Sequence, residues 1–123
     1  MEETTTQWQE ALFKDLGRDG FSSDMAEILL CIATAKKDLA NLRTFTKAST
    51  ISTELALAPA SSFIVYEPLG VVGIFGSWNY PIFVTLKPLV SAICAGNCAI
   101  IKPSEVGSHS SAMMKKFVDT YLD

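Results

Sequence analysis

The chain has 123 residues, of which 49% are hydrophobic and 19% are charged, and its formal net charge is -3. This length suits one domain with a buried core, and the composition excludes a disordered tail or a charge-rich binding arm. The weak negative charge gives no reason to expect a nucleic acid as a partner.

Two helices are expected in the first part of the chain. A short helix over 7–16 ends before Gly17, and a longer amphipathic helix runs over 24–47, where the Ser-Ser-Asp run at 22–24 offers N-cap chemistry. The apolar stripe of the longer helix is expected at Met25, Ile28, Leu29, Ile32, Leu39 and Leu42. Residues 7–47 are therefore predicted to form a helical lead-in.

Residues 48–70 are expected to form a connector and a bridging strand. The connector is rich in Ser, Thr and Ala and shows no period, which predicts an irregular and partly extended segment. The stretch SFIVYEPLGVVGIFG then predicts two strands that are joined by a bend at 68–70. The second strand, 71–75, is apolar at successive positions, which is typical of a parallel strand buried on both faces.

Residues 71–123 predict one β-α-β-α unit. A mostly apolar helix up to Gly96 connects the first strand to a second one over 98–102, and this short crossover predicts parallel strands with a right-handed connection. A last helix over 110–122 shows an apolar stripe that consists of Met113, Met114, Phe117, Val118, Tyr121 and Leu122.

The fold class is therefore α/β: N-terminal helices followed by the first β-α-β-α unit of a doubly wound, Rossmann-like domain. Two parallel strands do not make a sheet covered on both faces, and the last helix has little left to pack against. We therefore expect an incomplete domain that is the front part of a larger protein.

The start of the chain, MEETTTQWQE, is polar and acidic, unlike a signal peptide. The most apolar stretch, 82–101, is interrupted by charged and helix-breaking residues, so no membrane segment is expected. Three cysteines suit a reducing compartment, and we expect a cytoplasmic protein. We interpret Cys31, Cys94 and Cys98 as buried thiols without an activating base and His109 as an exposed loop residue, and no metal site is expected.

Two polar turns follow the two predicted parallel strands. GSWNYP follows the first and KPSE follows the second, and the carboxyl ends of parallel strands meet at one edge, where ligands usually bind. The first turn lacks the glycines of a G-x-G-x-x-G motif, so a dinucleotide that binds here must place its pyrophosphate elsewhere. Lys102 and Glu105 supply a donor and an acceptor that suit ribose hydroxyls.

The stretches EPLGVVGIFGSWNYP and KPLVSAICAGNCAIIKPSE resemble the aldehyde dehydrogenase superfamily, and most of all its class three and fatty aldehyde dehydrogenase branch. The likeness is nearly continuous over 67–105. Members of this family oxidise an aldehyde to the carboxylic acid: a cysteine thiolate attacks the carbonyl, and hydride passes to the cofactor. The resemblance therefore implies a small-molecule aldehyde as substrate, NAD or NADP as cofactor, and a homodimer for the full-length protein only.

The resemblance also implies roles for five residues. Asn79 matches the catalytic asparagine whose side-chain amide holds the developing oxyanion. Ser77 and Trp78 match positions on the nicotinamide side of the cofactor cleft, and Lys102 and Glu105 match the residues that hold the adenosine ribose.

The catalytic cysteine and the general-base glutamate of the family lie beyond the position that matches Asp123. Residues 1–123 are therefore expected to be the N-terminal part of an aldehyde dehydrogenase cofactor-binding domain. The alternative is a catalytically inactive module that at most binds nucleotide weakly or pairs with a full-length relative.

Each of these residues also has a purely structural interpretation. Asparagine is common in turns before helices, which would explain Asn79. Lys102 and Glu105 would form a solvated ion pair after a strand, and Trp78 and Tyr80 would pack in the core.

Overall fold

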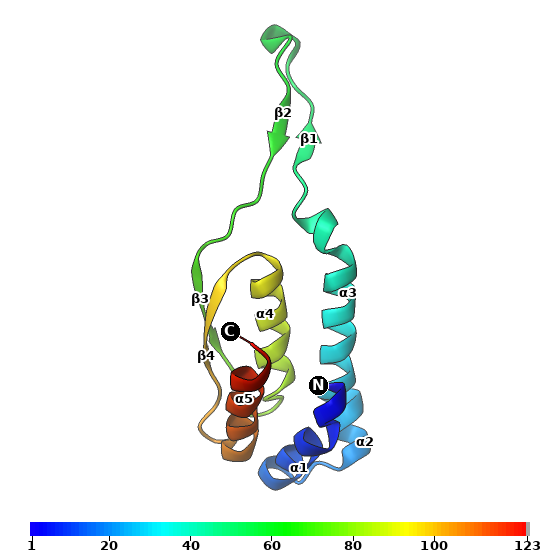
Figure 1. The fold of residues 1–123 in the computed structure, drawn as a ribbon, viewed down its shortest axis with the longest axis vertical. Helices are drawn as coiled ribbons and strands as arrows, with labels where there is room; N and C mark the ends of the chain where they lie inside the picture. The colour runs from blue at the N-terminus through cyan, green and yellow to red at the C-terminus, as the bar shows by residue number, and fades with distance from the viewer. Residues whose placement is uncertain (123) are drawn as a thin grey trace.

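The computed structural model describes residues 1–122, which form three layers and a projecting hairpin (Figure 1). No helix in this part of the chain has the length and apolar character needed to cross a bilayer. The elements in chain order are η1 (Glu2–Thr4), α1 (Thr5–Leu16), α2 (Gly20–Ser23), the π-helical turn η2 (Asp24–Ile28), α3 (Leu29–Phe45), β1 (Ser49–Ile51), η3 (Leu55–Leu57), β2 (Ser62–Ile64), β3 (Val71–Phe75), α4 (Phe83–Cys94), β4 (Cys98–Lys102) and α5 (Ser108–Tyr121).

The β-α-β-α unit predicted from the sequence is present. Strands β3 and β4 are parallel and pair in register from Val71 with Cys98 to Phe75 with Lys102. Helix α4 connects them and is followed by Gly96, whose φ of 78° is the left-handed conformation that glycine adopts without strain. The two strands and their parallel pairing are therefore confirmed.

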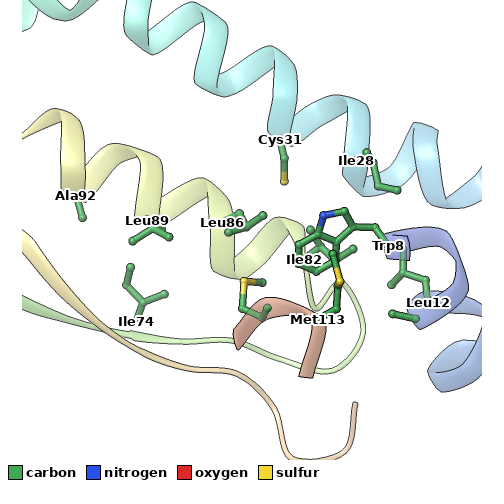
Figure 2. Close-up of a cluster of buried hydrophobic side chains, with 12 residues drawn as sticks. Trp8, Leu12, Ile28, Cys31, Ile74, Ile82, Leu86, Leu89, Ala92 and Met113 are labelled. Carbon is green, nitrogen blue, oxygen red and sulfur yellow. The ribbon is translucent and has the colours of Figure 1, made fainter. Parts of the chain in front are cut away.

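The three layers are the β3–β4 sheet, the helices α4 and α5, and the lead-in. Figure 1 shows α4 between the sheet and α3. Helix α3 packs against α4 and α1 packs against α5. Side chains from all three layers form one core, in which Ile74 of β3 lies near Leu89 of α4 (Figure 2).

Helix α5 is covered by α1, so the expectation that its apolar stripe has little to pack against was wrong. Trp8 and Leu12 of α1 are fully buried in the same cluster as Met113 and Met114. The ring of Trp8 lies 5.7 Å from that of Phe117, measured between centroids. The chain folds its first helix back onto its last one, a long-range contact that no local pattern predicts.

A carboxylate also joins α1 to α5. Asp15 accepts hydrogen bonds from the backbone N–H groups of His109, at 3.1 Å, and Ser110, at 2.7 Å, in the first turn of α5. Partial burial acts to raise the pKa of Asp15, but these hydrogen bonds outweigh it, and the pKa lies below its ordinary value. His109 is thus exposed as expected, but it belongs to a helix instead of a loop.

The strand β3 is buried on one face only, which corrects the prediction of burial on both. Ile74 faces the helices and is 7% exposed, whereas Val71 and Phe75 on the opposite face are 65% and 80% exposed. No element among residues 1–122 covers that second face. Successive apolar residues in the sequence therefore mark a second face that this part of the chain leaves open.

The long helix of the lead-in begins earlier than predicted. It starts at Gly20, and the side chain of Asp19 caps it by accepting the N–H of Ser22 at 2.9 Å, so the Ser-Ser-Asp run lies inside the helix. The predicted stripe is also only partly correct. Ile28 is buried in the core, but Met25, Leu29 and Leu39 are exposed, and the buried Cys31 lies outside the predicted stripe.

Strands β1 and β2 form an antiparallel hairpin that projects from the layers (Figure 1). The register joins Ser49 to Ile64 and Ile51 to Ser62. The bridging strand thus pairs with the connector rather than with the parallel sheet. The sequence predicted that the connector is partly extended, but it did not predict that the connector pairs with the bridging strand.

Candidate active site

The two polar turns named in the sequence meet at the carboxyl edge of the parallel sheet. Phe75 and Lys102 are partners at the ends of β3 and β4. Beyond them the N–H of Gly76 donates to the carbonyl of Lys102 at 2.9 Å. The structure therefore brings Ser77, Trp78 and Asn79 to the same edge as Lys102 and Glu105.

Gly76 allows the turn to pass close to helix α4. A Cβ atom at this position would lie 2.2 Å from Oγ1 of Thr85. Thr85 is fully buried, and its Oγ1 donates to the carbonyl of Pro81 at 2.8 Å, so it has little freedom to move. Only glycine fits between the strand end and the helix.

We expect Gly76→Ala to lower the free energy of unfolding by about 2 kcal/mol, because the added methyl group overpacks a buried contact. Urea denaturation measures this change. Gly73→Ala is the matched control, because a Cβ there would lie 3.4 Å from the exposed ring of Phe75. A loss for Gly73→Ala as large as that for Gly76→Ala would contradict the steric explanation.

The side chains of the first turn lie at the surface. Ser77 Oγ donates to Oδ1 of Asn79 at 2.6 Å, which orients the amide of Asn79. Trp78 is 54% exposed and Tyr80 is 42% exposed, so the interpretation of these two aromatic residues as core residues was wrong. The indole ring of Trp78 is accessible to a ligand at this edge.

A buried glutamate of the lead-in holds the start of the following helix. Glu27, which is fully buried, accepts the N–H of Ile82 at 2.7 Å and that of Phe83 at 3.0 Å through Oε2. Its other oxygen, Oε1, pairs with Arg18. Burial raises the pKa of Glu27, and the N–H groups of Phe83 and Ile82 and the charge of Arg18 offset this shift only in part.

Sequence analysis missed Arg18 and Glu27. Glu27 is the only charged residue between Met25 and Ala35, and a carboxylate in such an apolar stretch is a signal for a buried, paired group. The sequence pattern does not indicate which groups pair with Glu27. These lie 9 residues away at Arg18, and 55 and 56 residues away at Ile82 and Phe83.

Lys102 and Glu105 form an exposed pair on the second turn. Lys102 Nζ lies 2.8 Å from Oε2 of Glu105, and the hydrogen bond and charge of the lysine lower the pKa of the glutamate. The side chains are 59% and 81% exposed, so a ligand can reach both and replace the contact between them. An ammonium beside a carboxylate fits the hydroxyl pair of a ribose, which both accepts and donates.

The N-termini of both helices in the unit are already occupied by carboxylates. Glu27 takes the first N–H groups of α4, and Asp15 takes those of α5. Helix N-termini are the usual phosphate sites of dinucleotide-binding folds. The helices α4 and α5 of the β-α-β-α unit therefore offer no free N-terminus to the pyrophosphate of a dinucleotide.

The three cysteines lie away from the Asn79 turn or are unreactive. Cys31 is buried, and burial, with a smaller effect of the Glu27 charge, raises its pKa to about 12. Burial also raises the pKa of Cys94. Cys98 is exposed, which corrects the expectation of a buried thiol, but it lies at the amino end of β4 and Asn79 follows the carboxyl end of β3.

The chain is similar to aldehyde dehydrogenases over its whole length. A sequence model described as the aldehyde dehydrogenase family matches residues 1–121. Mouse (Mus musculus) aldehyde dehydrogenase family 3 member B2 is 44% identical over 115 residues, which cover 94% of this chain and 24% of the relative. Mouse family 3 member B3 is 41% identical over 123 residues, which cover 100% of this chain and 26% of the relative.

A solved structure shares the fold. The structure of the substrate-bound state of Staphylococcus aureus AldH superposes with a TM-score of 0.97 and 34% sequence identity, covering 99% of this chain and 27% of that protein. The chain thus spans about a quarter of the length of the relatives it matches. From the matching family model and these relatives, the chain belongs to the aldehyde dehydrogenase family.

Proposed function

We propose that residues 1–123 form the first part of the cofactor-binding domain of an NAD(P)-dependent enzyme that oxidises an aldehyde to a carboxylic acid. The observation that carries this proposal is the 2.9 Å hydrogen bond from Gly76 to Lys102. It brings the turn with Asn79 and the turn with Lys102 and Glu105 to one sheet edge. The proposed donor for the reacting oxygen and the proposed ribose-binding pair therefore lie at one edge of the sheet.

Asn79 is the proposed catalytic residue. Its Oδ1 accepts from Ser77, so Nδ2 is the atom of the amide that can donate to a substrate oxygen. Such a donor favours the oxyanion that develops when a nucleophile attacks an aldehyde. Asn79 is exposed at the sheet edge, where a substrate can reach it.

The cofactor is proposed to lie across the same edge. Lys102 and Glu105 would bind the adenosine ribose, and Ser77 and Trp78 would line the nicotinamide side. When bound, NAD or NADP would supply the hydride acceptor. The exposed positions of all four side chains are consistent with this assignment.

Residues 1–123 alone are proposed to be inactive as a dehydrogenase. Cys31 is buried and keeps its proton at neutral pH, and Cys98 lies at the other end of the sheet from Asn79. We therefore expect no NADH or NADPH formation by the isolated chain with any aldehyde, measured by absorbance. Turnover that Asn79→Ala abolishes would contradict this expectation.

We expect Glu105→Gln to weaken dinucleotide binding about tenfold, because a neutral amide is a poorer acceptor for ribose hydroxyls than a carboxylate. The test protein is S. aureus AldH in which residues 1–122 of this chain replace the segment that they match (the graft). Calorimetric titration with NAD and with NADP measures the change in Kd.

Asp119→Asn is the matched control for Glu105→Gln. Asp119 also pairs with a lysine, Lys115, in an exposed ion pair, but it lies on α5 away from the sheet edge. It is expected to leave both Kd values unchanged. A folded graft that binds neither dinucleotide, or equal effects of the two substitutions, would refute the proposed cofactor site.

A further inference from the structure

One arginine of the lead-in touches the main chain of the proposed catalytic turn. Arg18 Nη1 pairs with Glu27, while Nη2 donates to the carbonyl oxygen of Asn79 at 2.9 Å. The guanidinium carbon lies 4.9 Å from the centre of the Tyr80 ring. Arg18 thus contacts two successive residues of the turn and the glutamate that holds the following helix.

The Arg18–Glu27 pair reaches both ends of the segment from Asn79 to Phe83. Glu27 accepts N–H groups at the helix start, and Arg18 donates to the carbonyl at the turn. The two contacts together leave the intervening main chain little freedom to shift. The pair is therefore placed to determine where the turn lies relative to the lead-in.

The Arg18–Glu27 pair is largely removed from water, which carries a desolvation penalty. Glu27 is fully buried, and the side chain of Arg18 is 18% exposed. Removing two charges from water is unfavourable, and apolar residues of similar volume often stabilise a protein as well or better. Buried pairs of this kind contribute most when their hydrogen bonds select one geometry, and here that geometry includes Asn79.

Two hydrogen bonds hold Asn79 and orient its side-chain amide. Its backbone oxygen accepts from Arg18 and its side-chain oxygen accepts from Ser77 at 2.6 Å. Because Nδ2 shares a planar amide group with Oδ1, holding Oδ1 and the main chain also fixes the direction in which Nδ2 points. A shift of the main chain at this residue would carry Nδ2 away from a reacting oxygen.

We propose that Arg18 and Glu27 are positioning residues, which hold the Asn79 turn in the place from which its amide can stabilise an oxyanion. This inference rests on the proposed function of Asn79. The contacts of Arg18 in the structure are with Glu27, Asn79 and Tyr80. Its effect on catalysis passes through Asn79.

Amide hydrogen exchange on the 123-residue chain tests the positioning without any need for activity. Arg18→Leu is expected to speed exchange at Ile82 and Phe83 about tenfold, because loss of a charged hydrogen-bond partner loosens the turn. Arg18→Lys restores a cation beside Glu27 and is expected to recover most of the protection.

Asp15→Asn is the matched control for the exchange experiment. It weakens the corresponding carboxylate cap on α5, so it is expected to speed exchange at His109 and Ser110 and to leave Ile82 and Phe83 unchanged. Unchanged exchange at the turn in Arg18→Leu, or equal acceleration throughout the chain, would overturn the proposal.

A double-mutant cycle in the graft connects the positioning to catalysis. Arg18→Leu is expected to lower kcat about tenfold with the dinucleotide KM unchanged, because a misplaced catalytic group loses rate and not affinity. In the Asn79→Ala background the same substitution is expected to have no further effect on kcat.

The results of the double-mutant cycle distinguish the positioning role of Arg18 from the catalytic role of Asn79. Independent, multiplicative effects of Arg18→Leu and Asn79→Ala on kcat would overturn the positioning role, since Arg18 would then act without Asn79. If Asn79→Ala leaves kcat unchanged, the proposed function of Asn79 fails. Hydrogen exchange at Ile82 and Phe83 then still decides whether Arg18 holds the turn.

Discussion

In the graft, replacing Asn79 with alanine is expected to lower kcat by about 10²- to 10³-fold, which corresponds to about 3 to 4 kcal/mol of transition-state stabilisation. The amide donates to charge that is present in the transition state and absent from the free aldehyde. Loss of the donor should therefore change kcat far more than the KM for NAD or NADP. Steady-state kinetics with an aliphatic aldehyde measure both quantities.

Two further substitutions show whether the loss belongs to this amide. Ser77→Ala removes only the hydroxyl that donates to Asn79 Oδ1, so it is expected to lower kcat less than Asn79→Ala does. Asn41→Ala removes an exposed amide on α3 that donates to the carbonyl of Lys37, and it is expected to leave kcat unchanged. A fall in kcat of less than threefold for Asn79→Ala would refute the oxyanion role.

Glu27→Leu is expected to lower the free energy of unfolding of the chain by about 3 kcal/mol. Leucine fills much of the space, but it leaves the N–H groups of Ile82 and Phe83 without their acceptor and Arg18 without its carboxylate partner. Urea denaturation followed by circular dichroism measures the change. The control is Glu2→Gln, which removes a carboxylate from an exposed pair with Lys36 and is expected to leave stability unchanged.

Glu27→Gln distinguishes the contribution of the hydrogen-bond acceptor to stability from that of the negative charge. Glutamine keeps a carbonyl oxygen for the two N–H groups, so it is expected to be less destabilising than leucine. Burial raises the pKa of Glu27 above 4.5, so the folded state holds this proton more tightly than the unfolded state does. The stability that Glu27 contributes is then full below about pH 4.5 and is lost as the pH rises through the raised pKa.

The stability difference between the parent chain and Glu27→Gln is therefore expected to narrow as the pH rises through this range. Groups that both proteins share, such as Asp15, cancel in the comparison. A difference that widens with pH would mean that the pairing with Arg18 outweighs burial, and it would contradict the direction of the shift.

The candidate site was predictable to the extent that it depends on strand order and motif. GSWNYP and KPSE follow two strands whose apolar runs and connecting helix require parallel pairing, so their meeting at one edge follows from topology. The supporting groups were not predictable. Arg18 lies 61 residues before Asn79, and nothing in the residues around either one indicates the other.

The fold prediction was limited by local as well as long-range effects. The helix start at Gly20 was missed because Asp19 and the Ser-Ser-Asp run offer similar capping chemistry, and the local sequence does not rank them. The cover on α5 was missed because it is provided by α1. The apolar character of Val71 and Phe75 predicted burial on both faces of β3, and this was wrong for residues 1–122, which leave both side chains exposed.

The sequence by itself determined the parallel β-α-β unit, the edge at which its turns meet and the resemblance to aldehyde dehydrogenases. These features depend on neighbouring residues: apolar runs, the glycine at 96 and two continuous motifs. Only the tertiary structure decided that Glu27 occupies the N-terminus of α4, that Asp15 occupies that of α5, and that Arg18 reaches Asn79. Such contacts join side chains that are distant in the chain, and their geometry exists only once the layers have packed.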